Sequence, residues 1–560
     1  MTADQWDGWT RRWRGPLFAA LVALCAGLPG VLALPPLDRD ESRFVQATTQ
    51  MFEQGDFINI SFQDQPRHKK PVGIHWLQAV SVSLVSDPAE REIWAYRLPS
   101  LLGAMLAAAA CAWGASVFFG SGLGFASGAI LGASVLLSTE ASIAKTDAVL
   151  CGLVTLMMAA LGRLYAAGRD APVERPSRRE NRISIILFWA GFSLSVLIKG
   201  PIGPLVAALA LLTLWGWDRN LRWTRGIGWW WGLVAVLAVV GPWALAITIV
   251  TDGAFWATSL GGDLAPKLQG GHETHGGPPG YHTLAAPLML FPATLLLPAA
   301  LLLAWRRRRE PGVRFAVAWV LPAWILFELT PTKLVHYPLP LYGGLAWLFA
   351  AALPAAKGPW LRGLGAVLSV AAGAVFAALS FYAVSEHGDA GDPAWAAAAG
   401  GLALAAGLAG AVALLHRSTR TAFAVAGVLG IAAHGLIIGG LAPRLEPLWL
   451  SLRTARALDD AGLNPRAGGA PGPVAVAGYA EPSLVYALGT GTDLGDADAA
   501  AQAIAEGRPA VVEQRELAAF QAAAKRLEVT PRAVATILGV NYSRGDATML
   551  IVYRAEGAQP

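Results

Sequence analysis

Charged residues are scarce in this sequence. Only 14% of its 560 residues are Asp, Glu, Lys or Arg, whereas 55% are hydrophobic, and an average soluble protein carries roughly a quarter charged residues. A soluble protein of this composition would expose large apolar patches to water. The shortage of charge therefore excludes a disordered polymer and argues against a single soluble core. It favours a protein that lies in a lipid bilayer.

Cysteine is almost absent as well. Cys25, Cys111 and Cys151 lie in apolar runs and far from one another in the sequence. This number and spacing indicate neither a disulfide framework nor a metal site built on cysteine. We interpret all three as packing residues.

Long apolar runs, in contrast, are abundant. A helix that crosses a bilayer needs about 20 mostly apolar residues, and thirteen runs approach this length. They are 16–36, 98–119, 122–139, 147–165, 182–198, 201–217, 228–250, 284–304, 313–328, 335–352, 362–383, 396–415 and 421–441. The sequence thus predicts a polytopic α-helical membrane protein with about thirteen transmembrane helices. An odd number places the two termini on opposite sides of the membrane.

The distribution of basic residues predicts the orientation. Lys and Arg accumulate in cytoplasmic loops, and a cytoplasmic N-terminus puts the runs Arg175–Arg182 and Arg306–Arg309 on that side. The outer loops then carry mostly isolated lysines, so orientation explains the net charge of +5 and no nucleic-acid partner is expected. The first outer segment, 37–97, is the exception. Its many cations favour a bound anion, with salt bridging as the alternative.

Two domains are predicted. Residues 1–442 form the transmembrane domain, with outer loops 37–97 and 251–282, and residues 443–560 alternate strand-like and helical stretches, which is typical of a small α/β domain on the outer side. We expect amphipathic helices over Glu41–Glu53 and Val72–Leu84. Polar and aromatic residues of the outer domain are interpreted as parts of ordinary solvated loops, and the alternative is that they line a surface facing the active cavity. They are Tyr479, Glu481, Tyr486, Asn541 and Tyr542.

Residues that could take part in a chemical reaction gather on the predicted outer face. They form five groups: Asp38–Arg43, Arg67–His75, Lys145–Asp147, Lys199, and a last group of His272, His275, Lys333, His336 and Tyr337. A carboxylate can accept a proton from a hydroxyl group, and several cations can stabilise an anionic leaving group. Because the protein lies in a membrane, this combination favours transfer of a glycosyl group from a lipid phosphate. No Gly-rich nucleotide loop is evident in the outer loops.

The motifs resemble those of glycosyltransferases with the GT-C fold. Asp40-Glu41-Ser42-Arg43 resembles their D-E-x-R signature. Lys70-Pro71, Lys199-Gly200-Pro201 and Lys333-Leu334-x-His336-Tyr337 narrow the resemblance to bacterial aminoarabinose (4-amino-4-deoxy-L-arabinose) transferases, which are related to protein mannosyltransferases. The resemblance covers roughly residues 30 to 345.

The resemblance implies a polyprenyl (undecaprenyl) phosphate sugar donor, an envelope acceptor such as lipid A or another glycan or lipid, and an inverting transfer. It also implies a bacterial inner-membrane protein whose catalytic face and C-terminal domain are periplasmic. The candidate catalytic residues are Asp40, Asp147 and Glu41. The candidate phosphate-binding residues are Arg43, Lys70, Lys69, Lys199 and Lys333, and the candidate cavity residues are His275, His336 and Tyr337.

One residue departs from the family pattern. Aminoarabinose transferases have an acidic residue before the motif lysine, where it is associated with a metal, and this sequence has Lys69 there. A cation in that place removes a ligand and repels a divalent ion. The sequence therefore indicates no certain cofactor, and it disfavours a divalent metal, which stays open as the alternative.

Three alternatives remain open at this point. A protein O-mannosyltransferase-like enzyme would share the acidic motif but modify polypeptide hydroxyl groups. A lipid or sugar transporter is disfavoured, because the sequence shows no inverted repeat of broken helices and its ionisable residues gather near one membrane face. The third alternative is a non-catalytic assembly protein.

Overall fold

The computed structural model describes residues 3–168, 177–264, 276–356, 358–468 and 472–556. Within these residues, nine helices are long and apolar enough to cross a membrane. They are α2 (Arg14–Ala33), α5 (Ile93–Phe119), α8 (Thr146–Ala167), α9 (Arg178–Lys199), α11 (Trp229–Val250), α16 (Pro311–Leu329), α18 (Pro359–His387), α19 (Asp392–His416) and the stretch Thr419–Arg444, which begins with α20 (Thr419–Leu436). The predicted fold class, a multi-pass helical membrane protein, is confirmed.

The remaining four predicted runs are not straight, full-length helices. The run 122–139 is a pair, α6 (Ser121–Gly132) and α7 (Val135–Ala141), bent by 62°, and the run 284–304 contains α14 (Tyr281–Met289) and Ala293–Arg306, bent by 115°. Ser134 breaks the first pair by turning its hydroxyl group back to the Leu131 carbonyl. Pro292 interrupts the second, because it has no N–H to continue a helix. The other two runs are shorter helices, α10 (Ile202–Asp218) and α17 (Tyr342–Ala352).

Helix α8 is the centre of the bundle and is buried along nearly its whole length. It crosses α5 closely at two glycines, because a Cβ atom on Gly152 would lie 2.4 Å from the Gly103 carbonyl oxygen. Small residues at a crossing let two helix backbones approach each other, which is how membrane helices gain packing energy in lipid. This contact fixes the beginning of α8, where Asp147 lies.

The C-terminal region forms a five-stranded sheet with the strand order β4-β3-β5-β7-β6. Its strands are β3 (Ala475–Ala477), β4 (Asp493–Gly495), β5 (Ala510–Glu513), β6 (Pro531–Asn541) and β7 (Asp546–Ala555). Strands β4, β3 and β5 pair in parallel, and β7 pairs antiparallel with both β5 and β6. The predicted alternation of strands and helices is confirmed.

Helices cover both faces of this sheet. Alternate residues of a strand point to opposite faces, so Ala475 and Ala477 pack with α23 (Ala497–Ala505) and α24 (Leu517–Arg526). Val476 instead packs on the side of α21 (Leu450–Asp460) and α22 (Pro482–Leu488).

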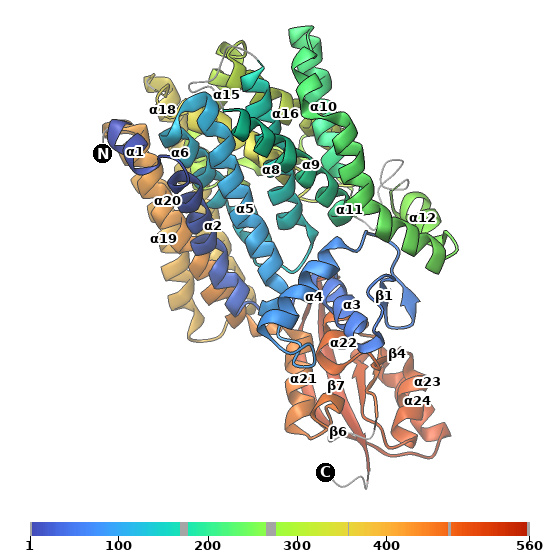
Figure 1. Ribbon diagram of the computed structural model, residues 1–560. Coiled ribbons are helices and arrows are strands. Elements are labelled where there is room, and N and C mark those ends of the chain that lie inside the picture. The colour runs from blue at the N-terminus through green and yellow to red at the C-terminus, as the bar shows by residue number, and fades with distance from the viewer. Residues whose placement is uncertain (1–2, 169–176, 265–275, 357, 469–471, 557–560) are drawn as a thin grey trace.

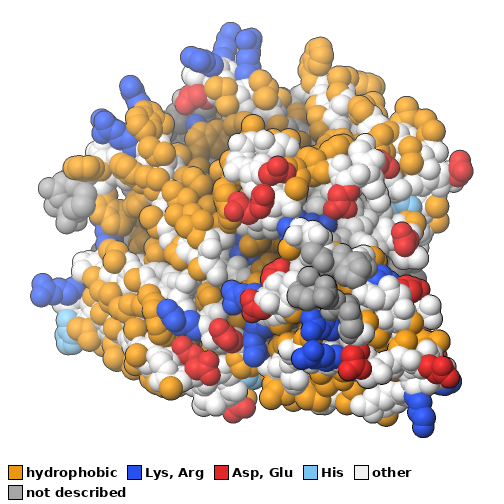
Figure 2. Space-filling model, turned by 90° about the horizontal axis from the view of Figure 1, so that it is seen from below, with side chains coloured by type: hydrophobic (Ala, Val, Ile, Leu, Met, Phe, Trp, Pro, Cys, Tyr) orange, Lys and Arg blue, Asp and Glu red, His pale blue; other side chains and the backbone are white. Residues whose placement is uncertain are grey.

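The N-terminus and the C-terminal sheet lie at opposite ends of the helix bundle, as Figure 1 shows. Between the bundle and the sheet lie α3 (Asp40–Gln54) and α4 (Gly73–Val85), where the two amphipathic helices were predicted. Seen from this end, acidic and basic side chains intermingle on the near face, and broad hydrophobic areas flank it (Figure 2). The segment that carries the predicted site thus lies where the bundle meets the polar end of the molecule.

Candidate active site

The first element of the site is the sharp turn that leads into α3. Helix α2 ends at Ala33, and Pro35 and Pro36 cannot donate the N–H groups that would extend it. Arg39 then adopts φ +60° and ψ −104°, and Asp40 begins α3. The Asp40 side chain is exposed and makes no hydrogen bond or ion pair with a described residue. The helix dipole favours a negative charge at this place.

Glu41 follows Asp40 but points into the protein. Its oxygens accept from Arg97 Nε at 2.8 Å and Nη2 at 2.7 Å, and this ion pair is fully buried. The backbone N–H groups of Leu37 and Ala144 also donate to it, at 2.9 and 2.7 Å. Four donors therefore occupy the carboxylate. This geometry gives no support to the prediction that Glu41 takes part in the chemistry, and it explains the residue as an anchor of the turn.

The second element is a buried group of ionised side chains where α7, α8 and α9 end or begin. Lys199, the last residue of α9, contacts Asp147 at 2.5 Å between Nζ and Oδ1. Lys145 Nζ lies 3.7 Å from Asp147 Oδ2 and 3.0 Å from Glu140 Oε2. Two ammonium groups thus neutralise two carboxylates, which is the condition for burying charges in a protein.

His336 and Tyr337 join this group from the segment between α16 and α17. His336 Nε2 lies 3.7 Å from Asp147 Oδ2, and its Nδ1 lies 3.6 Å from Glu140 Oε1. The ammonium group of Lys199 lies 5.6 Å from the centre of the Tyr337 ring, within the range of a cation–π interaction. The structure therefore brings four predicted residues together: Asp147, Lys199, His336 and Tyr337.

Asp40 belongs to the same neighbourhood. Its charge interacts electrostatically with Lys145 and with His336. Arg43 is half-buried and lies one helical turn after Asp40 on α3, so the two side chains share a face. The first turn of α3 thus lies within electrostatic range of the ionised group.

Lys69 and Lys70 precede α4 in the same outer segment. Lys69 is exposed and Lys70 is half-buried. Nearby, the guanidinium group of Arg67 lies 5.0 Å from the ring centre of Phe44. Helix α4 is fixed against α3 by a buried hydrogen bond of 2.8 Å between His75 Nδ1 and the Thr48 hydroxyl group. Helix α4, which begins shortly after the two lysines, thus packs against α3.

Lys333 has a different environment from the one predicted. Its ammonium group donates to the carbonyl groups of Glu328 and Thr330, both at 2.7 Å, and lies 3.4 Å from that of Phe327. These carbonyls belong to the end of α16, which has no further N–H donors of its own. Lys333 therefore caps a helix, and this geometry does not favour its predicted role in binding phosphate.

One residue of the ionised group was not predicted: Glu140 lies at the end of an apolar run, where the sequence gives no motif. Lys145 belongs to one of the five predicted groups, Lys145–Asp147, but no role was assigned to it. His272 and His275 lie outside the described residues. Among the described residues, no group of three His, Cys, Asp or Glu side chains could hold a metal ion.

The fold and the site define a class: a polytopic membrane protein of the GT-C type with a C-terminal α/β domain. Among solved structures, ArnT from Cupriavidus metallidurans bound to undecaprenyl phosphate has a TM-score of 0.77 and 18% identity, covering 97% of this chain and 98% of that one. The oligosaccharyltransferase of Archaeoglobus fulgidus in its apo form has a TM-score of 0.50 and 11% identity, covering 95% of this chain and 70% of that one. Both likenesses concern the fold.

The sequence comparison is more specific. The undecaprenyl phosphate-α-4-amino-4-deoxy-L-arabinose arabinosyl transferase of Pseudomonas aeruginosa is 27% identical over 334 residues. The match spans 58% of this chain and 58% of that protein. No family model matches the chain. The resemblance to aminoarabinose transferases and the GT-C fold, predicted from the motifs, is confirmed.

Proposed function

We propose that this protein is a membrane glycosyltransferase that moves a sugar from a polyprenyl-phosphate donor, such as undecaprenyl phosphate, to an envelope acceptor such as lipid A or another glycan or lipid. One observation carries the proposal: the exposed Asp40 carboxylate forms no salt bridge with a described residue, although its charge interacts with Lys145 and His336 of the ionised group. The relative from Pseudomonas aeruginosa, named for this kind of donor, supports the assignment.

The reaction follows from these charges. An acceptor hydroxyl oxygen attacks the anomeric carbon of the sugar, and Asp40 takes the hydroxyl proton as general base. The bond from the anomeric carbon to the phosphate oxygen breaks, and its electron pair leaves with the phosphate. Arg43, Lys70 and Lys199 stabilise the charge that develops there. A single displacement inverts the anomeric centre.

Asp147 takes a supporting part in this scheme. It lies between two ammonium groups and His336, so its oxygens are already engaged by cations of the protein. Its function is then to hold Lys199 in place, so that the ammonium group lies 5.6 Å from the Tyr337 ring centre and is available to the donor phosphate.

The proposed orientation has the N-terminus in the cytoplasm and the reacting groups in the periplasm. The exposed run Arg306–Arg309 begins with the last residue of α15 (Leu297–Arg306). In Figure 1, α15 lies at the end of the bundle away from the C-terminal sheet. Basic loops at one end and the site at the other support a bacterial inner-membrane protein with this topology.

Replacing Asp40 by Asn tests the proposal. The amide cannot accept a proton, so we expect transfer to fall by about 100-fold or more, with normal membrane insertion and unchanged binding of undecaprenyl phosphate. Asp64→Asn is the matched control, since Asp64 is an exposed acid of the same outer segment. Mass spectrometry of envelope lipids and glycans, from deletion cells carrying each variant, measures the product and identifies the sugar and the acceptor. Full product formation by the Asp40→Asn variant would refute the assignment.

A further inference from the structure

The turn before Asp40 is held by the C-terminal domain. The loop between β6 and β7 places the Tyr542 hydroxyl oxygen 2.6 Å from the backbone N–H of Asp38, which donates to it. One residue later, Arg39 Nη2 donates to the Ser543 carbonyl at 2.7 Å. Ser483 of α22 donates a hydrogen bond to the Asp38 carboxylate. Three groups from the C-terminal domain thus contact the two residues that precede the proposed base.

The local sequence does not account for the shape of this turn. Arg39 has a positive φ of +60°, which costs energy for a residue with a side chain and persists only where the surroundings impose it. Asp38 is half-buried, and desolvation raises the pKa of its carboxyl group to about 7. The hydrogen bonds to Tyr542, Ser543 and Ser483 supply the constraint at these two residues.

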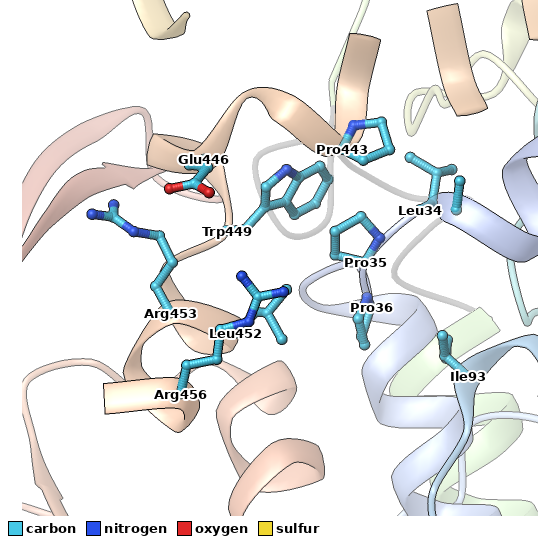
Figure 3. A pocket seen from close by; sticks show the side chains of 11 residues that line it. Leu34, Pro35, Pro36, Ile93, Pro443, Glu446, Trp449, Leu452, Arg453 and Arg456 are labelled. Atoms are coloured by element: carbon cyan, nitrogen blue, oxygen red, sulfur yellow. The ribbon is translucent and has the colours of Figure 1, made fainter. Parts of the chain in front are cut away.

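The segment before Asp38 is not closely packed on the side where Pro35 and Pro36 lie. Pro35 and Pro36 line a cavity of about 220 Å³, whose opposite wall includes Trp449 and Arg453 (Figure 3). A cavity leaves the chain beside it without partner atoms on that side. Directed hydrogen bonds therefore hold the turn: Glu41 accepts from the Leu37 N–H, and Tyr542 and Ser543 of the C-terminal domain hold residues 38 and 39.

The rest of α3 is clamped by the same domain. Arg91 is buried and donates to the Tyr486 carbonyl at 2.8 Å and to Gln46 of α3 at 2.9 Å. Gln46 in turn donates to the hydroxyl group of Thr490 at 2.6 Å. Tyr479, Glu481, Tyr486 and Asn541 are all buried, so their interpretation as solvated loop residues is wrong. Their surroundings are the interior of the domain and its contact with α3.

We propose that Tyr542 and Ser483 are positioning residues for Asp40. They fix the backbone of Asp38 and Arg39, and this sets the direction in which the Asp40 carboxylate leaves the first turn of α3. The inference rests on the proposed function, because it concerns the group that accepts the proton. A carboxylate displaced by about 1 Å loses much of its rate advantage, while the cations that hold the donor are unaffected.

Tyr542→Phe in the full-length protein tests this role. The variant removes the acceptor of the Asp38 N–H but keeps the aromatic ring, whose centre lies 6.3 Å from that of Trp449. We expect product formation per copy of protein in complemented deletion cells to fall about 10- to 100-fold. Binding of undecaprenyl phosphate and the thermal midpoint of the purified protein stay as in the wild type. Tyr553→Phe, a buried tyrosine in the sheet of the same domain, is the control and keeps full activity.

A second pair of variants separates positioning from folding. Ser483→Ala removes the donor to Asp38 and is expected to slow product formation, whereas Ser483→Thr keeps the hydroxyl group and restores it. Wild-type rates in both Tyr542→Phe and Ser483→Ala would overturn the inference. A fall in the thermal midpoint or in undecaprenyl phosphate binding, parallel to the fall in rate, would overturn it too. Wild-type protein that makes no product would refute the proposed function itself, and the inference with it.

Discussion

Lys69 is the residue on which the predicted metal independence rests. By the motif resemblance it stands where an acidic residue is expected, and its side chain is exposed in the same outer segment as Arg43 and Lys70. An ammonium group cannot ligate a divalent cation and repels it. The same charge adds to the attraction for a phosphate group.

We therefore expect transfer to be independent of divalent metal. Treatment of the purified protein with a chelator should leave the rate of product formation unchanged, and elemental analysis should find no stoichiometric zinc. A chelator-sensitive rate that added zinc restores would contradict this, and it would point to ligands outside the described residues.

The sequence predicted which residues meet better than it predicted what each one does. Asp147, Lys199, His336 and Tyr337 lie near helix ends on one face, and topology alone predicts that they come together. Glu41 and Lys333 are equally polar in the sequence, but both are bound inside the protein. Glu41 forms an ion pair with Arg97, and Lys333 donates to carbonyl groups at the end of α16. Motif and hydropathy do not reveal whether a charged group faces a substrate or a partner inside the protein.

At the scale of elements, the crossing of α5 and α8 fixes the position of the first turn of α8, where Asp147 lies. Gly152→Ala would put a methyl group 2.4 Å from the Gly103 carbonyl oxygen, so the two backbones must separate. Overpacking of this kind costs about 1–3 kcal/mol, and we expect a lower thermal midpoint together with reduced transfer.

Gly216→Ala is the matched control for this variant. Gly216 lies in α10, and an added Cβ there would meet no atom within 4 Å. Alanine is also the better helix former, so this variant should keep or slightly raise stability. Equal thermal midpoints for the two variants would show that the crossing tolerates a methyl group.

Hydropathy located the helical segments but not their shape. The runs 122–139 and 284–304 have the composition of single helices, yet each is sharply bent. Apolar composition sets whether a segment enters the bilayer, while bends depend on particular residues such as Ser134 and Pro292 and on their partners. Such partners are tertiary contacts, which a hydropathy run does not report.

At the scale of the whole molecule, the proposed topology has a direct test. Reporter fusions after Ala167, in the first long basic loop, and within the C-terminal domain should report opposite sides of the membrane. We expect the loop fusion to be cytoplasmic and the domain fusion periplasmic, because Lys and Arg are retained inside. Fusions that report the same side would contradict both the odd number of spans and the site.

The sequence predicted a second domain but not where it docks. Tyr542 and Asp38 are separated by 504 positions, and no local pattern connects residues so far apart. Strand and helix signals need only a few neighbouring residues, whereas docking depends on groups such as Arg91 and Thr490, which look like ordinary loop residues until the chain is folded.

The contact of Tyr542 with the turn before Asp40 also has a consequence for biosynthesis. Every membrane-spanning helix among the described residues precedes the β6–β7 loop along the chain, so the bundle can form before this loop is synthesised. Until then the Glu41–Arg97 ion pair anchors the turn, but the hydrogen bonds of Tyr542 and Ser543 are missing. We therefore expect docking of the C-terminal domain to complete the geometry around the proposed base.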